Sequence, residues 1–193
     1  MLTKQFLCIV WGKIMNKSEM ITVRRACLDD AEQAHRVVSE SMQIYCSKSG
    51  IARDKLDASF ETIENIRSSI IEAPFFVAVT PDGTIVGSVR LLPKKISDFA
   101  VPELAGLLAL GQDDTISYFS RFAVKEDLHG LGIGSLLYQT AQSEALQTQS
   151  KAILLHTALL NRIMVSFYEK RGFTLLFEDP SRGYPRGLFG KKL

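Results

Sequence analysis

Three glycines within five residues constrain this chain more than any other feature. Gly130, Gly132 and Gly134 lie in the stretch LHGLGIGSLL, after an apolar strand pattern at residues 115–124 and before a helical pattern that runs to about residue 147. A glycine inside a helix costs roughly 0.5–1 kcal/mol relative to alanine. The pattern therefore predicts a strand, a tight turn and a helix, with a turn whose backbone must be free of side chains.

A glycine-rich turn at the start of a helix is a typical anion site. The first N–H groups of a helix have no partner within it, and the helix dipole makes that end partly positive. Glycine leaves these amides accessible and tolerates the dihedral angles of an anion-binding turn. The alternative explanation is tight packing of the helix on a sheet, without any ligand.

Two common phosphate motifs do not fit the stretch. A dinucleotide site needs G-x-G-x-x-G and an acidic residue at the end of the next strand, and a P-loop needs a lysine before the serine or threonine. Here the spacing is G-x-G-x-G, no lysine precedes Ser135, and the strand AILLHT ends without an acid.

Hydrophobic periodicity predicts the other elements. Strands are expected at residues 20–26, 75–79, 84–92, 115–124, 152–159, 173–179 and 183–193. Helices are expected at residues 28–45, 55–73, 133–147 and 162–171, and a short one within the long connection 94–114. This order predicts a mixed α/β sheet with helices on its faces.

Length and composition indicate one domain without a nucleic-acid or membrane role. A chain of 193 residues can bury about 70% of its unfolded surface in a single core. The formal net charge of +2 predicts no nucleic-acid footprint. Residues 20–193 are expected to form the domain, with residues 1–19 as an extension, because the apolar run FLCIVW is too short for a membrane span.

The cysteines favour a reducing compartment. Cys8, Cys27 and Cys46 are odd in number and lack the spacing of metal ligands, so we expect reduced thiols in a cytoplasmic protein and no metal site.

Basic residues gather near the end of the sequence. The stretch SRGYPRGLFGKKL carries Arg182, Arg186, Lys191 and Lys192 and no acidic residue. It is either the solvated end of a strand or a cationic rim for an anionic ligand.

Two motifs resemble those of the GNAT N-acyltransferase superfamily. SRFAVKEDLHGLGIGSLL resembles motif A, which has [QR]-x-x-G-x-[GA] after a strand that ends in valine, here Val124. NRIMVSFYEKRGF, residues 161–173, resembles motif B. The resemblance covers roughly residues 20–193. It implies an α/β fold whose mixed, mostly antiparallel sheet is splayed at the motif-A strand and flanked by helices on both faces.

The resemblance also implies roles for individual residues. The donor would be acetyl-CoA, and Tyr168 would be the general acid that protonates the departing thiolate. The residues implied to bind acetyl-CoA are Phe122 and Val124 along the strand, His129, Gly130, Leu131, Gly132, Gly134 and Ser135 at the pyrophosphate, and Asn161 at the pantetheine arm. His129 replaces the family's usual arginine or glutamine; it either donates one hydrogen bond to the ligand or faces solvent.

The general base stays open at this stage. Strand alternation places Tyr118, Ser120, Phe122 and Val124 on one side of the sheet, if no bulge intervenes. A water relayed by Tyr118 and main-chain carbonyls is one alternative, and nearby carboxylates are another. These carboxylates are Glu103, Asp113 and Asp114. His156, in the middle of a strand, is expected to be a buried structural histidine.

The implied activity is transfer of an acetyl group to a primary amine by direct attack in a ternary complex. A non-catalytic acyl-CoA-binding module is the alternative. In the resembled family the acceptor site comes from segments that correspond to residues 41–60 and 94–114. The second segment is mostly apolar, which favours either a covered acceptor pocket or a lid helix. A covered pocket would suit a small-molecule amine rather than a protein. A homodimer is the default assembly.

Overall fold

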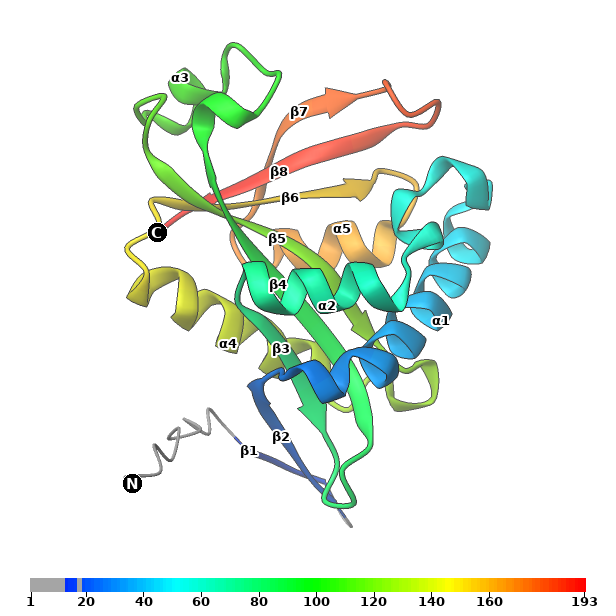
Figure 1. The fold of residues 1–193 in the computed structure, drawn as a ribbon. Coiled ribbons are helices and arrows are strands. Elements are labelled where there is room, and N and C mark those ends of the chain that lie inside the picture. The colour runs from blue at the N-terminus through cyan, green and yellow to red at the C-terminus, as the bar shows by residue number, and fades with distance from the viewer. Residues whose placement is uncertain (1–12, 17–18) are drawn as a thin grey trace.

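The computed structural model describes residues 13–16 and 19–193, and strands from both ends of this range join one sheet (Figure 1). The eight strands have the order β1-β2-β3-β4-β5-β6-β8-β7. Their bounds are β1 Lys13–Asn16, β2 Glu19–Arg25, β3 Phe75–Val79, β4 Ile85–Lys95, β5 Thr115–Val124, β6 Ala152–Ala158, β7 Thr174–Asp179 and β8 Arg186–Lys192. Part of the expected N-terminal extension thus forms β1, which pairs antiparallel with β2; residues 1–12 and 17–18 lie outside the described residues.

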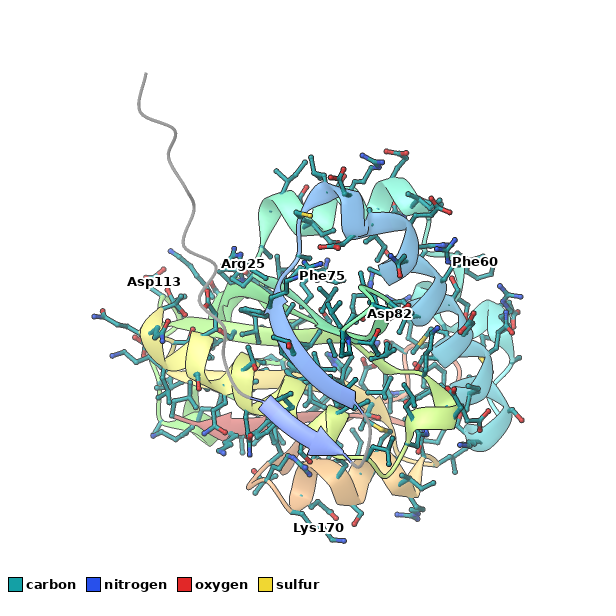
Figure 2. All side chains as sticks on the ribbon, turned by 90° about the horizontal axis from the view of Figure 1, so that it is seen from below. Arg25, Phe60, Phe75, Asp82, Asp113 and Lys170 are labelled. Atoms are coloured by element: carbon teal, nitrogen blue, oxygen red, sulfur yellow. The ribbon has the colours of Figure 1, made fainter. Side chains whose placement is uncertain are left out.

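The helices cover both faces of the sheet. They are α1 Ala31–Ser49, α2 Ile63–Glu72, α3 Leu104–Leu108, α4 Ile133–Gln147 and α5 Arg162–Glu169. The side chains of β3 alternate between two hydrophobic cores, one on each face of the sheet. Phe75 and Val77 pack with α1 and α2, whereas Phe76 and Ala78 pack with α4. Figure 2 shows Phe75 in the interior of the molecule.

The sheet is splayed between β5 and β6. These two strands are its parallel pair, and their register is limited to Ser117↔Ile153 and Tyr118↔Leu154. β6 stays paired with β8 over its whole length, so β5 loses its neighbour on that side after Tyr118. The expectation of a mostly antiparallel sheet, splayed at this strand and covered by helices on both faces, is confirmed.

A β-bulge in β5 changes the side-chain alternation that was expected from the sequence. The β4–β5 register shifts between Ser88 and Arg90, and Arg121 has φ 51°. Because a bulge inserts one extra residue, Tyr118 faces α1 and α3, whereas Phe122 and Val124 face α4 and α5 together with Phe119. The expectation that Tyr118, Ser120, Phe122 and Val124 share one side is therefore wrong.

The second helix is shorter than its apolar pattern suggested. Residues 53–55 and 57–60 form 3-10 turns, and α2 begins only after Thr62, whose side chain accepts a hydrogen bond from Asn65 N at 3.1 Å. Phe60, within the helix expected at residues 55–73, lies outside α2 and is exposed, at the periphery in Figure 2.

Candidate active site

A cavity of about 570 Å³ lies where β5 separates from β6. It is lined on one side of the sheet by α4, α5 and the turn before α4, and on the other by α1. Nine of the ten residues implied by the two motifs line it: Phe122, Val124, His129, Gly130, Gly132, Gly134, Ser135, Asn161 and Tyr168. Leu131 is the exception, and its side chain is exposed.

The three glycines serve two different purposes. Gly130 and Gly132 have φ of 82° and 83°, in the left-handed region that favours glycine, and a Cβ on Gly130 would meet open space. Gly132 is the N-cap of α4. Gly134 lies inside the helix, where a Cβ would approach Phe122 Cζ to 3.3 Å. Thus Gly130 and Gly132 permit the left-handed turn before α4, while Gly134 permits close packing of the helix on β5.

His129 ties this turn to the end of β5. Its Nε2 donates to the carbonyl oxygen of Val124 at 3.0 Å. Lys125 N donates to Val86 O, and Val124 lies opposite Gly87 in the register. In an antiparallel pair the hydrogen-bonded positions alternate, so the N–H and C=O of Val124 point into the splay. His129 thus caps the carbonyl, and the N–H of Val124 faces the cavity.

Arg171 supplies a permanent positive charge beside the turn, and the sequence analysis missed it. Its Nη2 donates to Ser135 Oγ at 2.7 Å and its Nη1 to Phe167 O at 2.8 Å. The guanidinium carbon also lies 3.5 Å from the centroid of the Phe167 ring. In the sequence, Arg171 is visible only as a basic residue between the end of α5 and Gly172. Its contact with α4 forms only in the folded protein.

Asn161 and Tyr168 occupy the two ends of the motif-B helix. Asn161 caps α5, because its Oδ1 accepts from Met164 N at 3.2 Å. Tyr168 is buried among aromatic rings, with Phe119 and Phe122 at centroid distances of 6.1 and 6.4 Å. This burial raises the pKa of the Tyr168 phenol far above its usual value, so the hydroxyl keeps its proton throughout the physiological range.

On the α1 side of the sheet, Tyr118 and His156 form a hydrogen-bonded pair that lines the cavity. Tyr118 Oη lies 2.9 Å from His156 Nδ1, and His156 Nε2 lies 4.0 Å from Asp179 Oδ2. Burial, and next the nearby charge of Arg186, lower the pKa of His156 to about 4, so the ring is neutral at pH 7. A carboxylate beside Nε2 favours the tautomer with its proton there, and Tyr118 then donates to Nδ1. His156 was expected to be only structural.

The expected carboxylate bases lie elsewhere. None of Glu103, Asp113 and Asp114 lines the cavity. Asp113 accepts from Lys95 Nζ at 2.9 Å at the opposite end of β5 and sits at the outer edge of the molecule in Figure 2. The whole connection 94–114 contributes nothing to the lining, because its apolar residues pack against β5 and β6 in a separate core. Of the two expected acceptor segments, only residues 41–60 reach the cavity.

Comparison with known proteins agrees with this geometry. A sequence profile described as the acetyltransferase (GNAT) family matches residues 42–173, more than half of the chain. The chain belongs to this family. This GNAT acetyltransferase has no significant match among curated proteins.

Solved structures share the fold of this GNAT acetyltransferase at low sequence identity. The PaiA N-acetyltransferase of Thermoplasma acidophilum, solved in complex with coenzyme A, has 20% identity and a TM-score of 0.64, over 90% of this chain and 99% of that one. A GNAT-family acetyltransferase of Listeria monocytogenes has 18% identity and a TM-score of 0.66, over 94% and 100%. FeeM, an N-acyl amino acid synthase from uncultured soil microbes, has 16% identity and a TM-score of 0.66, over 91% and 92%.

Other site types are not visible in the part of the chain that the structure describes. There, no three His, Cys, Asp or Glu side chains gather as metal ligands, and no helix is both long and apolar enough to cross a membrane. Cys27 and Cys46 are free thiols, and Cys8 lies outside the described residues.

Proposed function

We propose that this GNAT acetyltransferase transfers an acetyl group from acetyl-CoA to the primary amine of a small molecule, by direct attack in a ternary complex. The observation that carries the proposal is the continuity of the cavity. It runs through the splay of the sheet, from the glycine turn and Arg171 on one side to Tyr118 and His156 on the other. One end suits an anionic donor and the other suits proton transfer from an acceptor.

The donor half is built to hold a diphosphate and an extended arm. The amides of residues 130–135 and the guanidinium of Arg171 face the position of the diphosphate. The N–H of Val124 points into the splay, where an extended ligand would pair with β5 as an additional strand does. Acetyl-CoA supplies the acetyl group as a thioester, and Phe122 and Asn161 flank its path.

Tyr168 provides the proton that the leaving thiolate needs. Tyr168 lines the cavity, and no group in the described part of the chain forms a hydrogen bond with its hydroxyl. The high pKa of Tyr168 keeps the phenol protonated until a strong base forms beside it, and the C–S bond cleavage forms that base.

Tyr118 and His156 provide a route for the proton of the acceptor amine. An ammonium group at Tyr118 can transfer a proton to Oη while Tyr118 passes its own proton to His156 Nδ1. The neutral ring accepts it because Nδ1 is the unprotonated nitrogen. The amine then attacks with its free electron pair. This proton transfer is uphill, since the pKa of His156 is about 4 and that of a primary ammonium is about 10. We therefore expect turnover to rise with pH, as more of the acceptor enters as the free amine.

The dimensions of the site support a small acceptor. A cavity of about 570 Å³ falls within the range of about 300–1,000 Å³ that is typical of small-molecule sites, although the donor also occupies part of it. FeeM, a structural neighbour, is described as an N-acyl amino acid synthase, which supports a small acceptor.

Tyr168→Phe tests the proposal. We expect kcat for acetyl-CoA-dependent release of free CoA to fall roughly 10²-fold, the lower end of general-acid effects, with acetyl-CoA affinity unchanged. Tyr138→Phe is the matched control: Tyr138 belongs to the same aromatic cluster but lies outside the cavity lining, with Lys191 as its hydrogen-bond donor. Unchanged turnover in Tyr168→Phe would reduce Tyr168 to a packing residue.

A further inference from the structure

We infer that the acceptor amine carries an anionic group of its own, as an amino acid does, and that Arg121 binds this group. The inference rests on the proposed function and adds the chemical class of the acceptor. It follows from the distribution of charge around the cavity.

The cavity is lined by cations without acids. Among the residues that the structure describes, Lys48, Arg121, Arg171 and Arg186 line it, and no aspartate or glutamate does. Arg171 serves the diphosphate end through Ser135, and Lys48 lies 3.1 Å from Glu126, next to the glycine turn. Arg121 and Arg186 remain for the acceptor half. A polycationic acceptor would be repelled by such a lining, since like charges in a site of low dielectric constant are costly.

Arg121 is held in place by the bulge and by a buried carboxylate. Its backbone is in the left-handed region, with φ 51°, which is uncommon for a residue with a side chain. Its Nε forms an ion pair with Glu61, whose side chain is only 2% exposed, whereas the Arg121 side chain keeps 22% exposure. His35 is half-buried, and its Nε2 hydrogen-bonds the main-chain oxygen of Glu61 at 2.9 Å. The guanidinium is therefore positioned by the protein, on a residue that lines the cavity and whose side chain is not fully buried.

Glu61 does not neutralise the positive charge in this region. Arg90 lies beside the pair, and its hydrogen bonds go to neutral hydroxyls, from Nε to Ser120 Oγ at 3.0 Å and from Nη1 to Ser69 Oγ at 2.9 Å. Burial, and next the charge of Arg121, lower the pKa of Arg90. Two guanidinium groups thus share one buried carboxylate. The exposed carboxylate of Glu72 also acts on Arg90, but Glu72 does not line the cavity. An anion on the ligand would therefore place a negative charge inside the cavity, where the described lining has none.

Arg186, on β8, also lines the cavity. It pairs with Asp179 through Nε and Nη2, so its charge is largely balanced there. Arg186 and Arg182 act on His156 as cations, and Asp179 opposes them. Lys191 contacts Tyr138 on the far side of β8. Arg121 is therefore the better candidate for an anionic group on the acceptor.

The position of Arg121 relative to the proposed proton route fits a small zwitterion. Tyr118 and Arg121 are three residues apart on β5 and serve the same half of the cavity. Three residues of strand span about 10 Å. The long side chain of Arg121 can bring its guanidinium closer than this to Tyr118. An acceptor with its amine at Tyr118 and its acid group at Arg121 would be oriented for attack.

The first test uses the wild-type protein. The probes are the twenty standard amino acids, their carboxamides, their decarboxylated amines, and aminomethylphosphonate. We expect at least one acid-bearing probe to be acetylated with a kcat/KM more than tenfold above that of its carboxamide and its decarboxylated amine. Comparison of carboxylates with aminomethylphosphonate distinguishes which acid group the site takes. Equal or faster turnover of the carboxamides or the decarboxylated amines would overturn the inference and leave the proposed function standing.

Binding decides the question even if turnover fails. In protein saturated with CoA, an acid-bearing probe should raise Tm while its carboxamide does not. Such discrimination without any acetylated product would sustain the inference and count against the proposed function. Absence of any Tm increase from every acid-bearing probe would overturn the inference.

The second test assigns the role to Arg121. Arg121→Gln alone leaves Glu61 buried without its partner, which destabilises the fold, so the double variant Glu61→Gln/Arg121→Gln is compared with it. We expect KM for the acid-bearing acceptor to rise more than tenfold, its advantage over the carboxamide to disappear, and acetyl-CoA affinity to stay unchanged. Arg67→Gln, at an exposed position of α2 outside the cavity lining, is the control. Loss of acetyl-CoA affinity instead would assign Arg121 to the donor and contradict the inference.

Discussion

Arg171 Nη2 donates a hydrogen bond of 2.7 Å to Ser135 Oγ and so joins the end of α5 to the first turn of α4. These residues are 36 positions apart. Their contact places a permanent cation beside the glycine turn, in which His129 stands where the resembled motif has arginine or glutamine. We propose that Arg171 supplies the charge that His129 lacks.

Arg171→Gln should weaken acetyl-CoA binding. A hydrogen bond to a charged group contributes about 1.5–3 kcal/mol, so we expect Kd to rise roughly 10- to 100-fold, measured by titration calorimetry. Lys170→Gln is the matched control, because Lys170 is exposed at the outer edge of the molecule in Figure 2 and does not line the cavity. Equal affinities in the two variants would remove Arg171 from the diphosphate site.

Gly132→Asp should abolish acetyl-CoA binding while the fold persists. The aspartate would bring a side chain and a negative charge to the N-cap of α4, where the diphosphate is expected. Gly83→Asp, in the turn between β3 and β4, controls for backbone strain, since Gly83 has a similar φ of 87° and lies in open space. Wild-type affinity in Gly132→Asp would show that the turn does not hold the donor.

Tyr118→Phe should lower kcat because it removes the hydroxyl that links the amine to His156. We expect a decrease of roughly 10²-fold near pH 7, with acetyl-CoA affinity unchanged. The defect should shrink as pH rises, because more of the acceptor then enters as the free amine. A defect of constant size from pH 6 to 9 would assign Tyr118 to positioning rather than proton transfer.

The stability of the protein should depend on pH through His156. Its pKa in the folded state, about 4, is lower than the ordinary value of 6.5, so the folded state binds this proton less readily than the unfolded state. The stability that the neutral ring contributes is therefore complete above pH 6.5 and is lost as pH falls from 6.5 to 4. The difference corresponds to about 3 kcal/mol. His156→Gln should flatten this part of the curve in chemical unfolding at several pH values; identical slopes for the two proteins would contradict it.

Much of the architecture could be predicted from local patterns. The strand at residues 115–124, the turn and the helix to Gln147 appear where alternation, glycine and helical spacing indicate them. These signals depend on neighbours in the chain, since dihedral preferences and side-chain periodicity are local properties. The two motifs extended this reading to the family and to the residues that line the cavity.

The sequence alone thus determined the order of the elements, the glycine turn and the family. Only the tertiary structure decided that β5 carries a bulge at Arg121, that Glu61 is buried against it, and that Tyr118 meets His156. The same is true of Arg171 beside Ser135. Each of these depends on register, burial or a contact between segments far apart in the chain. No local pattern encodes such relationships, because their free energy comes from groups that are brought together only when the sheet and its helices pack.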